Sequence, residues 1–443
     1  MIGNESHSLR GYKQTEIGEI PEDWKLKTFG EIFDFKSTAS NSRSDLTKSD
    51  STHYIHYGDI HTVFHRHLNL EKRETPMISQ ELCKNASLVR NGDWVMADAS
   101  EDYSGICKAI EISGISEEKS VVAGLHTFLL RDREGAYVPG FKGHLGEAKY
   151  LHDQYVRVSV GLKVFGVTKT SLRDLLIPVP PKIEQSRIEK MLTDSDSQIQ
   201  ALELLISKKR DIKQATMQEL LTGKTRLPGH SGVWESKILE NTATLNARIG
   251  WQGLTTEEYL DYGDFLLVGG TEFNDGFVDW KSCFFVEETR FKQDKKIQLR
   301  EDDVLVTKDG TIGKVALVQN LPMSATLNSG VFVIRSKKGI FHARFFYYLL
   351  LSRVFIDFLN RLVAGSTINH LYQKDFVDFE FHLPPTIEEQ QAIAEILSDM
   401  DAEIATLEKR LEKAKAIKKG MMQQLLTGRI RLVDSSTPQE ARV

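Results

Sequence analysis

Two long stretches of the chain carry apolar residues at alternating intervals of four and three positions. The stripe consists of Ile188, Leu192, Ile199, Leu202 and Ile206 in the first stretch and of Ile393, Leu397, Met400, Ile404, Leu407 and Leu411 in the second. Apolar residues that recur about every 3.5 positions predict a helix that pairs with another helix. Each stretch lacks an internal proline and ends in Leu-Leu-Thr-Gly, whose glycine suits the left-handed position after a helix. The pattern predicts two long helices, over residues 181–227 and 385–432.

The simplest partner for each predicted helix is the other helix of the same chain, in an antiparallel pair. A coiled coil between two copies of the chain is the alternative. Ser195 and Lys209 interrupt the first stripe, and polar residues at such positions can fix register or orientation at some cost in stability. At the start of the second helix, Thr386 and Glu389 fit a capping box.

The two helical stretches are copies of one another. Residues 185–227 and 390–432 align without a gap at an offset of 205, and 19 of the 43 positions are identical. Fainter matches pair Trp24 with Trp234 and Asp93 with Asp303. The repeat therefore divides the chain into a variable block and a helix, followed by a second block and a second helix. The expected divisions around the two helices are a tail over 1–19, a first block over 20–180, a second block over 228–384 and a flexible tail over 433–443.

The variable blocks combine both kinds of secondary structure. Runs of β-branched and apolar residues predict strands over 127–130, 304–307, 315–318 and 331–334. An amphipathic pattern predicts a helix over 343–359. The expected fold class is mixed α/β (α+β), with two globular domains separated by a pair of long antiparallel coiled-coil helices and related by a pseudo-twofold internal repeat.

Composition narrows the class of protein. Hydrophobic residues make up 40% of the chain and charged residues 27%, which is ordinary for a globular protein. No apolar run approaches the roughly 20 residues that span a bilayer, and the N-terminus lacks the apolar core of a signal peptide. The three cysteines are far apart in sequence, which argues against a disulfide framework. We therefore expect a cytoplasmic protein without a membrane anchor.

Several short motifs occur in a fixed order along the chain. They are Ile-Pro-x-x-Trp at 20–24, Gly-Leu-Lys-Val-Phe-Gly at 161–166, proline-led helix starts at 181–185 and 384–390, Ala-Arg-Ile-Gly-Trp at 247–251, Lys-Asp-Gly-Thr-Ile-Gly-Lys at 308–314 and the two Leu-Leu-Thr-Gly ends. The second block has Gly-Ser-Thr at 365–367 where the first has Gly-Leu-Lys. In this duplicated order, the chain resembles the specificity (S) subunits of type I restriction–modification systems along nearly its whole length.

The resemblance implies a non-catalytic subunit that recognises DNA for a larger complex. Each variable block would be a target-recognition domain that reads one half of a bipartite, asymmetric site in double-stranded DNA. The paired helices would set the distance between the halves and dock two methyltransferase subunits. Those subunits would bring S-adenosylmethionine, and motor–nuclease subunits would bring ATP and Mg, so this chain would hold no cofactor.

The remaining motifs do not favour a nucleotide-binding, metal or catalytic site in this chain. At 223–225, Gly-Lys-Thr resembles the end of a phosphate-binding loop, but Gln218 stands where that loop needs its first glycine. Histidines at 53, 56, 61, 65 and 67 could bind zinc. Neither a cysteine pair nor an HExxH pattern accompanies them, so a base-reading or structural loop is the expectation. With no methyltransferase motif and no glycine-rich cofactor loop, we expect neither a catalytic residue nor a metal site.

Candidate DNA contacts follow from residue type. They are Lys36, Arg43, His65, Arg66 and Lys108 in the first block and Arg248, Trp251, Gln252, Lys308 and Lys314 in the second. Arginine, lysine and glutamine are common readers of base edges, and neighbouring glycines allow close backbone approach. The alternative for Trp251 is a packed core aromatic, and the alternative for the first-block residues is an ordinary exposed side chain.

The net charge of −5 is unusual for a chain that binds DNA, because phosphate neutralisation supplies much of the affinity. Either the basic residues cluster locally or partner subunits supply much of the phosphate contact. Two other functions stay open: a self-contained DNA-modifying enzyme, and a coiled-coil scaffold without DNA binding.

Overall fold

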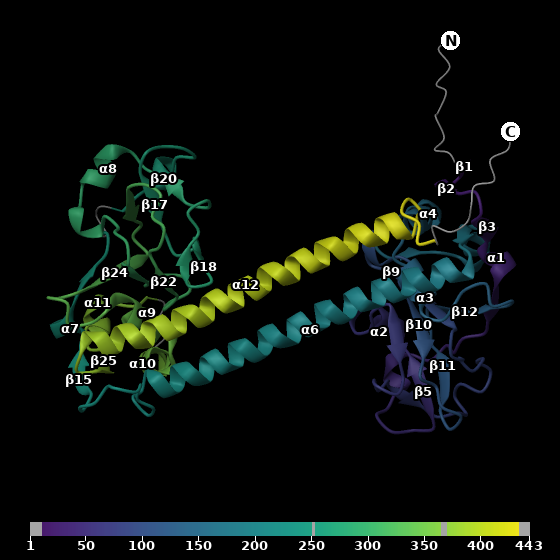
Figure 1. Cartoon of the computed structure of the whole chain (residues 1–443), viewed down its shortest axis with the longest axis horizontal. Helices are drawn as coiled ribbons and strands as arrows, with labels where there is room; N and C mark the ends of the chain where they lie inside the picture. Colours follow the sequence, from purple (N-terminus) through teal and green to yellow (C-terminus); the bar gives the residue numbers. More distant parts are fainter. Residues whose placement is uncertain (1–10, 250–252, 365–369, 434–443) are drawn as a thin grey trace, which may run out of the picture. The chain divides into compact units, whose positions relative to one another are not determined.

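The computed structural model describes residues 11–249, 253–364 and 370–433 (Figure 1). The chain divides into unit 1, which is Met1–Leu202 with Arg410–Val443, and unit 2, which is Glu203–Lys409. Helices α6 (Lys182–Leu220) and α12 (Ile387–Leu425) each contribute to both units. Unit 1 therefore contains the start of α6 and the end of α12, whereas unit 2 contains the end of α6 and the start of α12.

Unit 1 is built on a mixed sheet with the strand order β4-β12-β8-β10-β6 and a smaller sheet with the order β11-β5-β7. Its strands are β1 Tyr12–Thr15, β2 Gly18–Pro21, β3 Lys25–Thr28, β4 Phe33–Lys36, β5 Thr52–Ile55, β6 His67–Asn69, β7 Met77–Ile78, β8 Trp94–Ala97, β9 Ala99–Ser100, β10 Ala109–Ser113, β11 Ser120–Ala123, β12 Thr127–Asp132, β13 Phe165–Gly166 and β14 Leu176–Val179. Its shorter helices are α1 Phe29–Ile32, α2 Tyr57–Thr62, α3 Phe141–Leu145, α4 Lys149–Val158 and α5 Lys169–Asp174.

Unit 2 has the same plan, with a main sheet in the order β16-β24-β21-β22-β19-β18 and a smaller sheet in the order β20-β17-β23. Its strands are β15 Glu235–Ile238, β16 Ala243–Asn246, β17 Leu266–Val268, β18 Phe273–Asn274, β19 Phe277–Val278, β20 Phe284–Phe285, β21 Val304–Thr307, β22 Val315–Leu317, β23 Ala325–Leu327, β24 Val331–Ser336 and β25 Glu380–Leu383. Its shorter helices are α7 Leu239–Thr242, α8 Glu288–Lys292, α9 Ala343–Leu351, α10 Arg353–Ala364 and α11 Gln373–Phe376.

The central strand of each main sheet separates two apolar cores. All four residues of β8 and of β21 are buried. Successive side chains of a strand point to opposite faces, so alternate residues enter different cores. Trp94 and Met96 pack in the core that includes the long helices, while Val95 and Ala97 pack in the other. Continuous apolar runs, which sequence reading assigned to strands, therefore reflect burial on both faces.

The same ion pair precedes both central strands, in agreement with the predicted match of Asp93 and Asp303. Arg131 donates two hydrogen bonds to Asp93, at 2.9 and 2.6 Å. Arg335 donates two to Asp303, both at 2.6 Å. Both carboxylates are nearly buried, at 3% and 5% side-chain exposure, so they hold strands together and do not face solvent.

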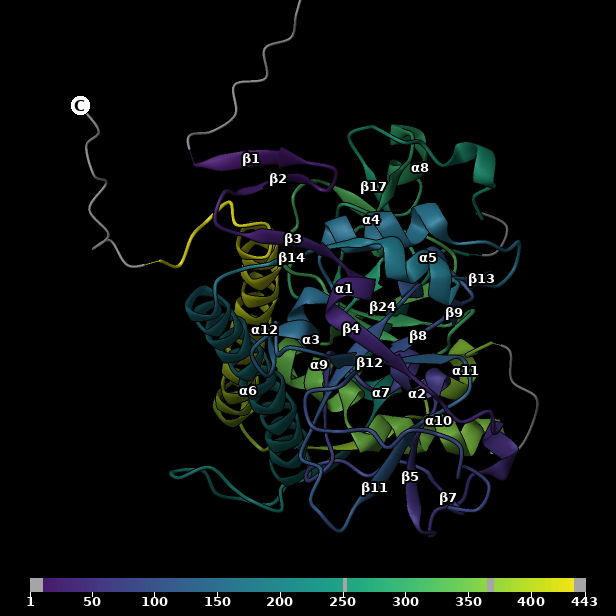
Figure 2. The same ribbon diagram turned by 90° about the vertical axis from the view of Figure 1, so that its right-hand side faces the viewer.

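Within each unit the segments of α6 and α12 run antiparallel. In unit 1, the end of α12 lies beside the start of α6 in both views (Figure 1 and Figure 2), and Asp196 pairs with Lys418. In unit 2, Lys209 lies 2.7 Å from Glu403, so a polar position that interrupts the stripe pairs across the helices. The stripe residues Ile188, Leu192, Leu202, Ile206, Ile393, Leu397, Ile404 and Leu407 are buried, and Ile199, Met400 and Leu411 are half-buried. The predicted antiparallel pairing within one chain is confirmed, and the coiled coil between two copies is not needed to cover the stripe.

Each helix ends as its glycine predicted. Gly223 and Gly428 adopt φ of 71° and 68°. The N–H of Thr225 donates to Glu219 O at 3.3 Å, and that of Ile430 donates to Gln424 O at 3.2 Å. These bonds satisfy carbonyls that the helix leaves open at its end. The helices stop at Leu220 and Leu425, so the predicted spans 181–227 and 385–432 include the turns that follow.

Equivalent junctions then join each turn to the start of the other helix. In unit 1, Arg431 donates to both carboxylate oxygens of Glu184, at 2.8 and 2.9 Å, and the Trp24 indole N–H donates to Glu184 at 2.9 Å. In unit 2, Arg226 donates to both oxygens of Glu389, at 2.6 and 2.7 Å. Each glutamate side chain is 1% exposed. The sequence repeat therefore encodes two copies of one buried junction.

Glu389 departs from the predicted capping box. The Glu389 N–H donates to the Thr386 hydroxyl at 3.3 Å, which is half of the motif. The Glu389 carboxylate is bound by Arg226, because a buried carboxylate is better satisfied by a bidentate guanidinium than by one backbone N–H.

Two expected segments differ from the structure. The helix predicted over 343–359 is broken at Ser352, whose hydroxyl donates to Leu349 O at 2.6 Å and accepts from Val354 N at 3.3 Å. A serine side chain that satisfies the backbone in this way ends one helix and starts the next. In the expected N-terminal tail, β1 and β2 form an antiparallel hairpin. The Tyr12 hydroxyl donates to Gly428 O at 2.7 Å, so the turn that follows α12 holds the hairpin.

Across the described residues, no helix has both the length and the apolar character needed to cross a bilayer.

Candidate nucleic-acid interface

In unit 1, polar and aromatic side chains gather where the buried strand β8 ends. Asp98 follows β8, and its Oδ1 lies 3.2 Å from Nδ1 of His126, the residue before β12. The Tyr57 ring stands edge-on to the His126 ring, with centroids 5.4 Å apart. The His126 side chain is 50% exposed, so the group reaches solvent. We call Asp98, His126 and Tyr57 the unit 1 cluster.

Burial sets the electrostatics around this cluster. Burial raises the pKa of the Asp98 carboxyl, and His126 opposes that shift. Burial also lowers the pKa of the neighbouring His56 imidazole, and the charge of Arg43 lowers it further. Arg43 in turn pairs with Asp59, which is buried at the start of α2. The region thus holds oriented polar groups that are partly withdrawn from water.

In unit 2, a similar group lies beyond the end of β21. The Asp309 carboxylate pairs with Nδ1 of His370, and the two residues also form a backbone bridge. The ring of Tyr372 lies beside that of His370, with centroids 4.6 Å apart. Tyr372 is 52% exposed. We call Asp309, His370 and Tyr372 the unit 2 cluster.

On the repeated scaffold, Asp98 and His126 of the unit 1 cluster stand where unit 2 has Lys308 and Gly330. The N–H of Asp98 donates to His126 O at 3.1 Å, and the N–H of Lys308 donates to Gly330 O at 2.9 Å. The backbone contact is the same, but the side chains differ: unit 1 has a carboxylate and an imidazole where unit 2 has an ammonium and no side chain. One scaffold therefore presents different chemistry in its two copies.

The candidate contacts of the first block occupy different surroundings. Lys36 lies 3.2 Å from Asp34 on β4, Arg43 lies next to the unit 1 cluster, and His65 is exposed between α2 and β6. Lys108 donates to His61 O at 2.8 Å. Arg66 lies 3.0 Å from both Glu147 and Asp196, so it ties the block to α6. The structure thus brings Arg43 into contact with His56 and Lys108 into contact with His61, and both histidines lie beside Tyr57 of the cluster.

Arg248 is a correction to the candidate contacts of the second block. Its side chain is buried, with 1% exposure, and donates to Leu327 O at 2.9 Å. Burial, with a smaller effect of the charge of Arg290, lowers the pKa of its guanidinium. A side chain enclosed in this way holds the small sheet in place and cannot reach a base. The neighbouring candidates Trp251 and Gln252 lie outside the described residues.

The two candidate lysines of the 308–314 loop are more accessible to a ligand than Arg248. Lys308 is half-buried, with its Nζ 5.5 Å from the centre of the Phe332 ring. Lys314 is exposed. Gly310 and Gly313 adopt φ of 67° and 78°, which allows the tight turn between β21 and β22. The loop therefore carries a basic residue at each end, beside the unit 2 cluster.

The histidines of the first block do not converge on one point. His53 bonds to Thr75, His61 to Ala99 O and His67 to Gly140 O. His56 accepts from Gly58 N at 3.0 Å. In the parts of the chain that the structure describes, no three or more His, Cys, Asp or Glu side chains are placed to hold a metal ion.

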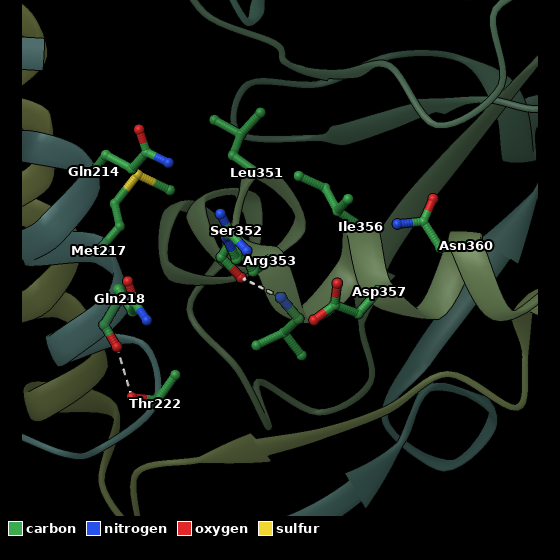
Figure 3. Close-up of a pocket in the computed structure, with 11 residues that line it drawn as sticks. Gln214, Met217, Gln218, Thr222, Leu351, Ser352, Arg353, Ile356, Asp357 and Asn360 are labelled. Atoms are coloured by element: carbon green, nitrogen blue, oxygen red, sulfur yellow. Dashed lines mark hydrogen bonds between the residues drawn. The ribbon is translucent and has the colours of Figure 1, made fainter. Parts of the chain in front are cut away.

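A pocket of about 380 Å³ in unit 2 lies between the end of α6 and the break at Ser352 (Figure 3). Its charged lining residues, Arg353 and Asp357, are both exposed. The dashed contacts are local: Thr222 donates to Gln218 O, and Val354 N–H donates to Ser352. The pocket lacks the desolvated acid–base arrangement that catalysis requires.

Sequence reasoning missed both histidine clusters. Asp309 was part of the motif at 308–314, but Asp98, His126, His370, Tyr57 and Tyr372 were not singled out. The available signal was a carboxylate within two residues of the end of a continuous apolar strand in each half.

Comparison with known proteins finds several that this chain resembles. Residues 252–416 match the family described as "Type I restriction modification DNA specificity domain". A Methanocaldococcus jannaschii protein named as a specificity subunit of the type I restriction enzyme MjaX is 26% identical over 448 residues, covering 95% of this chain and 97% of that protein. The resemblance indicated by the sequence is confirmed.

Solved structures agree on the fold. The S subunit of a type I restriction–modification system from M. genitalium has a TM-score of 0.53 at 14% identity, covering 91% of this chain and 96% of that chain. A chain from a study of complex assembly and conformational transition in the type I R-M system has a TM-score of 0.56 at 16% identity, covering 93% and 99%. The predicted fold class is confirmed.

Proposed function

We propose that this chain, which belongs to the specificity subunits of type I restriction–modification systems, selects a split, asymmetric DNA sequence on which partner subunits act. One observation carries the proposal: equivalent scaffolds present unlike side chains at the ends of β8 and β21. Sequence is read by donors and acceptors at base edges, whereas phosphate contacts position the protein. Two copies of one reader with different side chains therefore read two different half-sites.

The chemistry belongs to partner subunits. Two methyltransferase subunits bring S-adenosylmethionine and flip the base to be modified, and motor–nuclease subunits bring ATP and Mg. This chain is non-catalytic. The two equivalent helix junctions support a pair of methyltransferase docking sites, one for each junction. Partner subunits also supply much of the phosphate contact, which accounts for a reader with a net charge of −5.

The long helices set the spacing between the half-sites. A four-residue insertion after Leu204 adds about one helical turn, or roughly 6 Å. The recognised site should then gain one or two unread base pairs, given about 3.4 Å per base pair. An unchanged spacer would contradict this role of the helices.

The function is tested by methylome sequencing of a host that carries this chain with its cognate partners. The expected result is modification at two unlike half-sites separated by a fixed unread spacer. A continuous palindrome would overturn the proposal. Binding of S-adenosylmethionine by the purified chain alone would favour a self-contained enzyme, and failure of the assembled complex to shift any DNA would favour a scaffold.

A further inference from the structure

We propose that His126 and His370 are base-reading residues, each oriented by a carboxylate and a tyrosine to accept a hydrogen bond from an exocyclic amino group of adenine or cytosine. This inference rests on the proposed function, because it names the residues that read DNA within the two target-reading surfaces.

The carboxylates define which imidazole nitrogen is available. Nδ1 of His126 lies 3.2 Å from Asp98 Oδ1, and Nδ1 of His370 pairs with Asp309. An ionised carboxylate only accepts hydrogen bonds, so Nδ1 carries the proton in a neutral ring. Nε2 then presents its lone pair. Within the described residues, neither Nε2 atom has a hydrogen-bond partner, and the side chains are 50% and 31% exposed.

The aromatic neighbours restrict the rings further. Tyr57 meets His126 at an interplanar angle of 75°, and Tyr372 meets His370 at 59°. His126 also has a φ of 56°, a left-handed conformation that non-glycine residues seldom adopt and that is enriched at functional sites. Both rings are thus held in place before any DNA arrives, which lowers the cost of binding.

The two arrangements are alike although the repeat does not supply them at matching positions. His126 precedes β12, whereas His370 precedes α11. Asp98 directly follows β8, whereas Asp309 is two residues beyond β21. The same Asp–His–Tyr grouping has therefore been assembled from different segments at the same end of each sheet. Packing of the shared scaffold does not require this grouping, so its recurrence from different segments supports a shared role in reading DNA.

Adenine and cytosine each expose an amino group in the major groove, at N6 and N4, while guanine and thymine present acceptors there. An imidazole Nε2 that accepts therefore selects adenine or cytosine. Asp98 and Asp309 are positioning residues, since they act through the histidines.

The test compares methylomes of hosts that carry the complex with His126→Ala, His370→Ala or a control, His382→Ala, which removes an exposed histidine on β25. His126→Ala should relax one adenine or cytosine position in one half-site, and His370→Ala one such position in the other, each with about 5- to 100-fold lower discrimination. Asp98→Asn should relax the same position as His126→Ala. The control should leave the motif unchanged.

A second measurement identifies the contact. At the relaxed position, DNA is prepared with adenine replaced by purine, or cytosine by 2-pyrimidinone, so that only the amino group is lost. This DNA should bind the unchanged complex about 5- to 100-fold more weakly, and the histidine variant with no further loss. Equal losses for both proteins would overturn the inference.

The two proposals fail in different ways. A wild-type methylome without a split motif would remove the proposed function. A split motif that neither histidine variant alters would leave the function standing and overturn this inference alone. Because the side chains are partly exposed, assembly of each variant with its partners, measured by gel filtration, should match that of wild type.

Discussion

The two junctions allow the same substitution, arginine to methionine, to be made once in each unit. We expect the two variants to lose different amounts of the free energy of unfolding. Arg226→Met leaves Glu389, with a side chain 1% exposed, without the guanidinium that binds both of its oxygens. Removing one partner of a buried ion pair costs about 3–5 kcal/mol. Arg431→Met leaves Glu184 with hydrogen bonds from the Trp24 indole at 2.9 Å and the Leu432 N–H at 3.3 Å. We therefore expect Arg431→Met to lower the free energy of unfolding by only about 1–3 kcal/mol.

Hydrogen exchange measured by mass spectrometry suits this comparison, because it reports local opening free energies in each unit separately. Arg226→Met should lower protection at the start of α12, and Arg431→Met at the start of α6. In a double variant, Arg226→Met with Glu389→Leu, both charges are replaced by apolar groups, which should restore most of the stability. We expect the difference because Glu184 keeps other hydrogen-bond donors after the substitution and Glu389, among the described residues, does not. Equal losses of stability for the two single variants, or a loss below about 1 kcal/mol for Arg226→Met, would refute this reasoning.

Three further predictions follow from particular side chains. Arg248→Met should destabilise unit 2 by about 1–3 kcal/mol in hydrogen exchange, because it leaves the buried carbonyl of Leu327 without its donor. The methylated DNA motif should stay the same, and a changed motif would contradict the place of Arg248 in the core. Burial lowers the pKa of His144 from 6.5 to about 2, so between these values the unfolded chain binds a proton that the folded chain does not, and stability should fall with decreasing pH. From pH 7 to pH 5, wild type should lose about 2 kcal/mol more than His144→Gln in denaturant titrations of unit 1, and parallel losses would contradict this. Gly161 has a φ of 142°, and an added Cβ would lie 1.9 Å from Val164 O, so Gly161→Ala should increase exchange in the 161–166 loop while the β8 core keeps its protection.

The sequence by itself determined the repeated architecture. Helix pairing follows from spacings of three and four residues, and helix ends follow from glycines that tolerate positive φ, so both are encoded over short distances. The strands at 304–307 and 331–334 could also be predicted from local sequence, because a strand that is buried on both faces consists of consecutive apolar residues. Duplication of residues 185–227, together with the glutamate that precedes each copy, gives both junctions the same arginine–glutamate pair.

Tertiary structure decided which polar residues come together and which of them reach the surface. Asp98 and His126 are 28 residues apart, and Asp309 and His370 are 61 apart, so neither pair leaves a periodic signal in the sequence. Arg248 has the residue type of a base reader, yet packing over it leaves 1% of it exposed. The guanidinium group determines which groups an arginine can bind, but its exposure to solvent depends on strands that are distant in the chain. The local pattern therefore specified the scaffold, and long-range packing specified the surface that it presents.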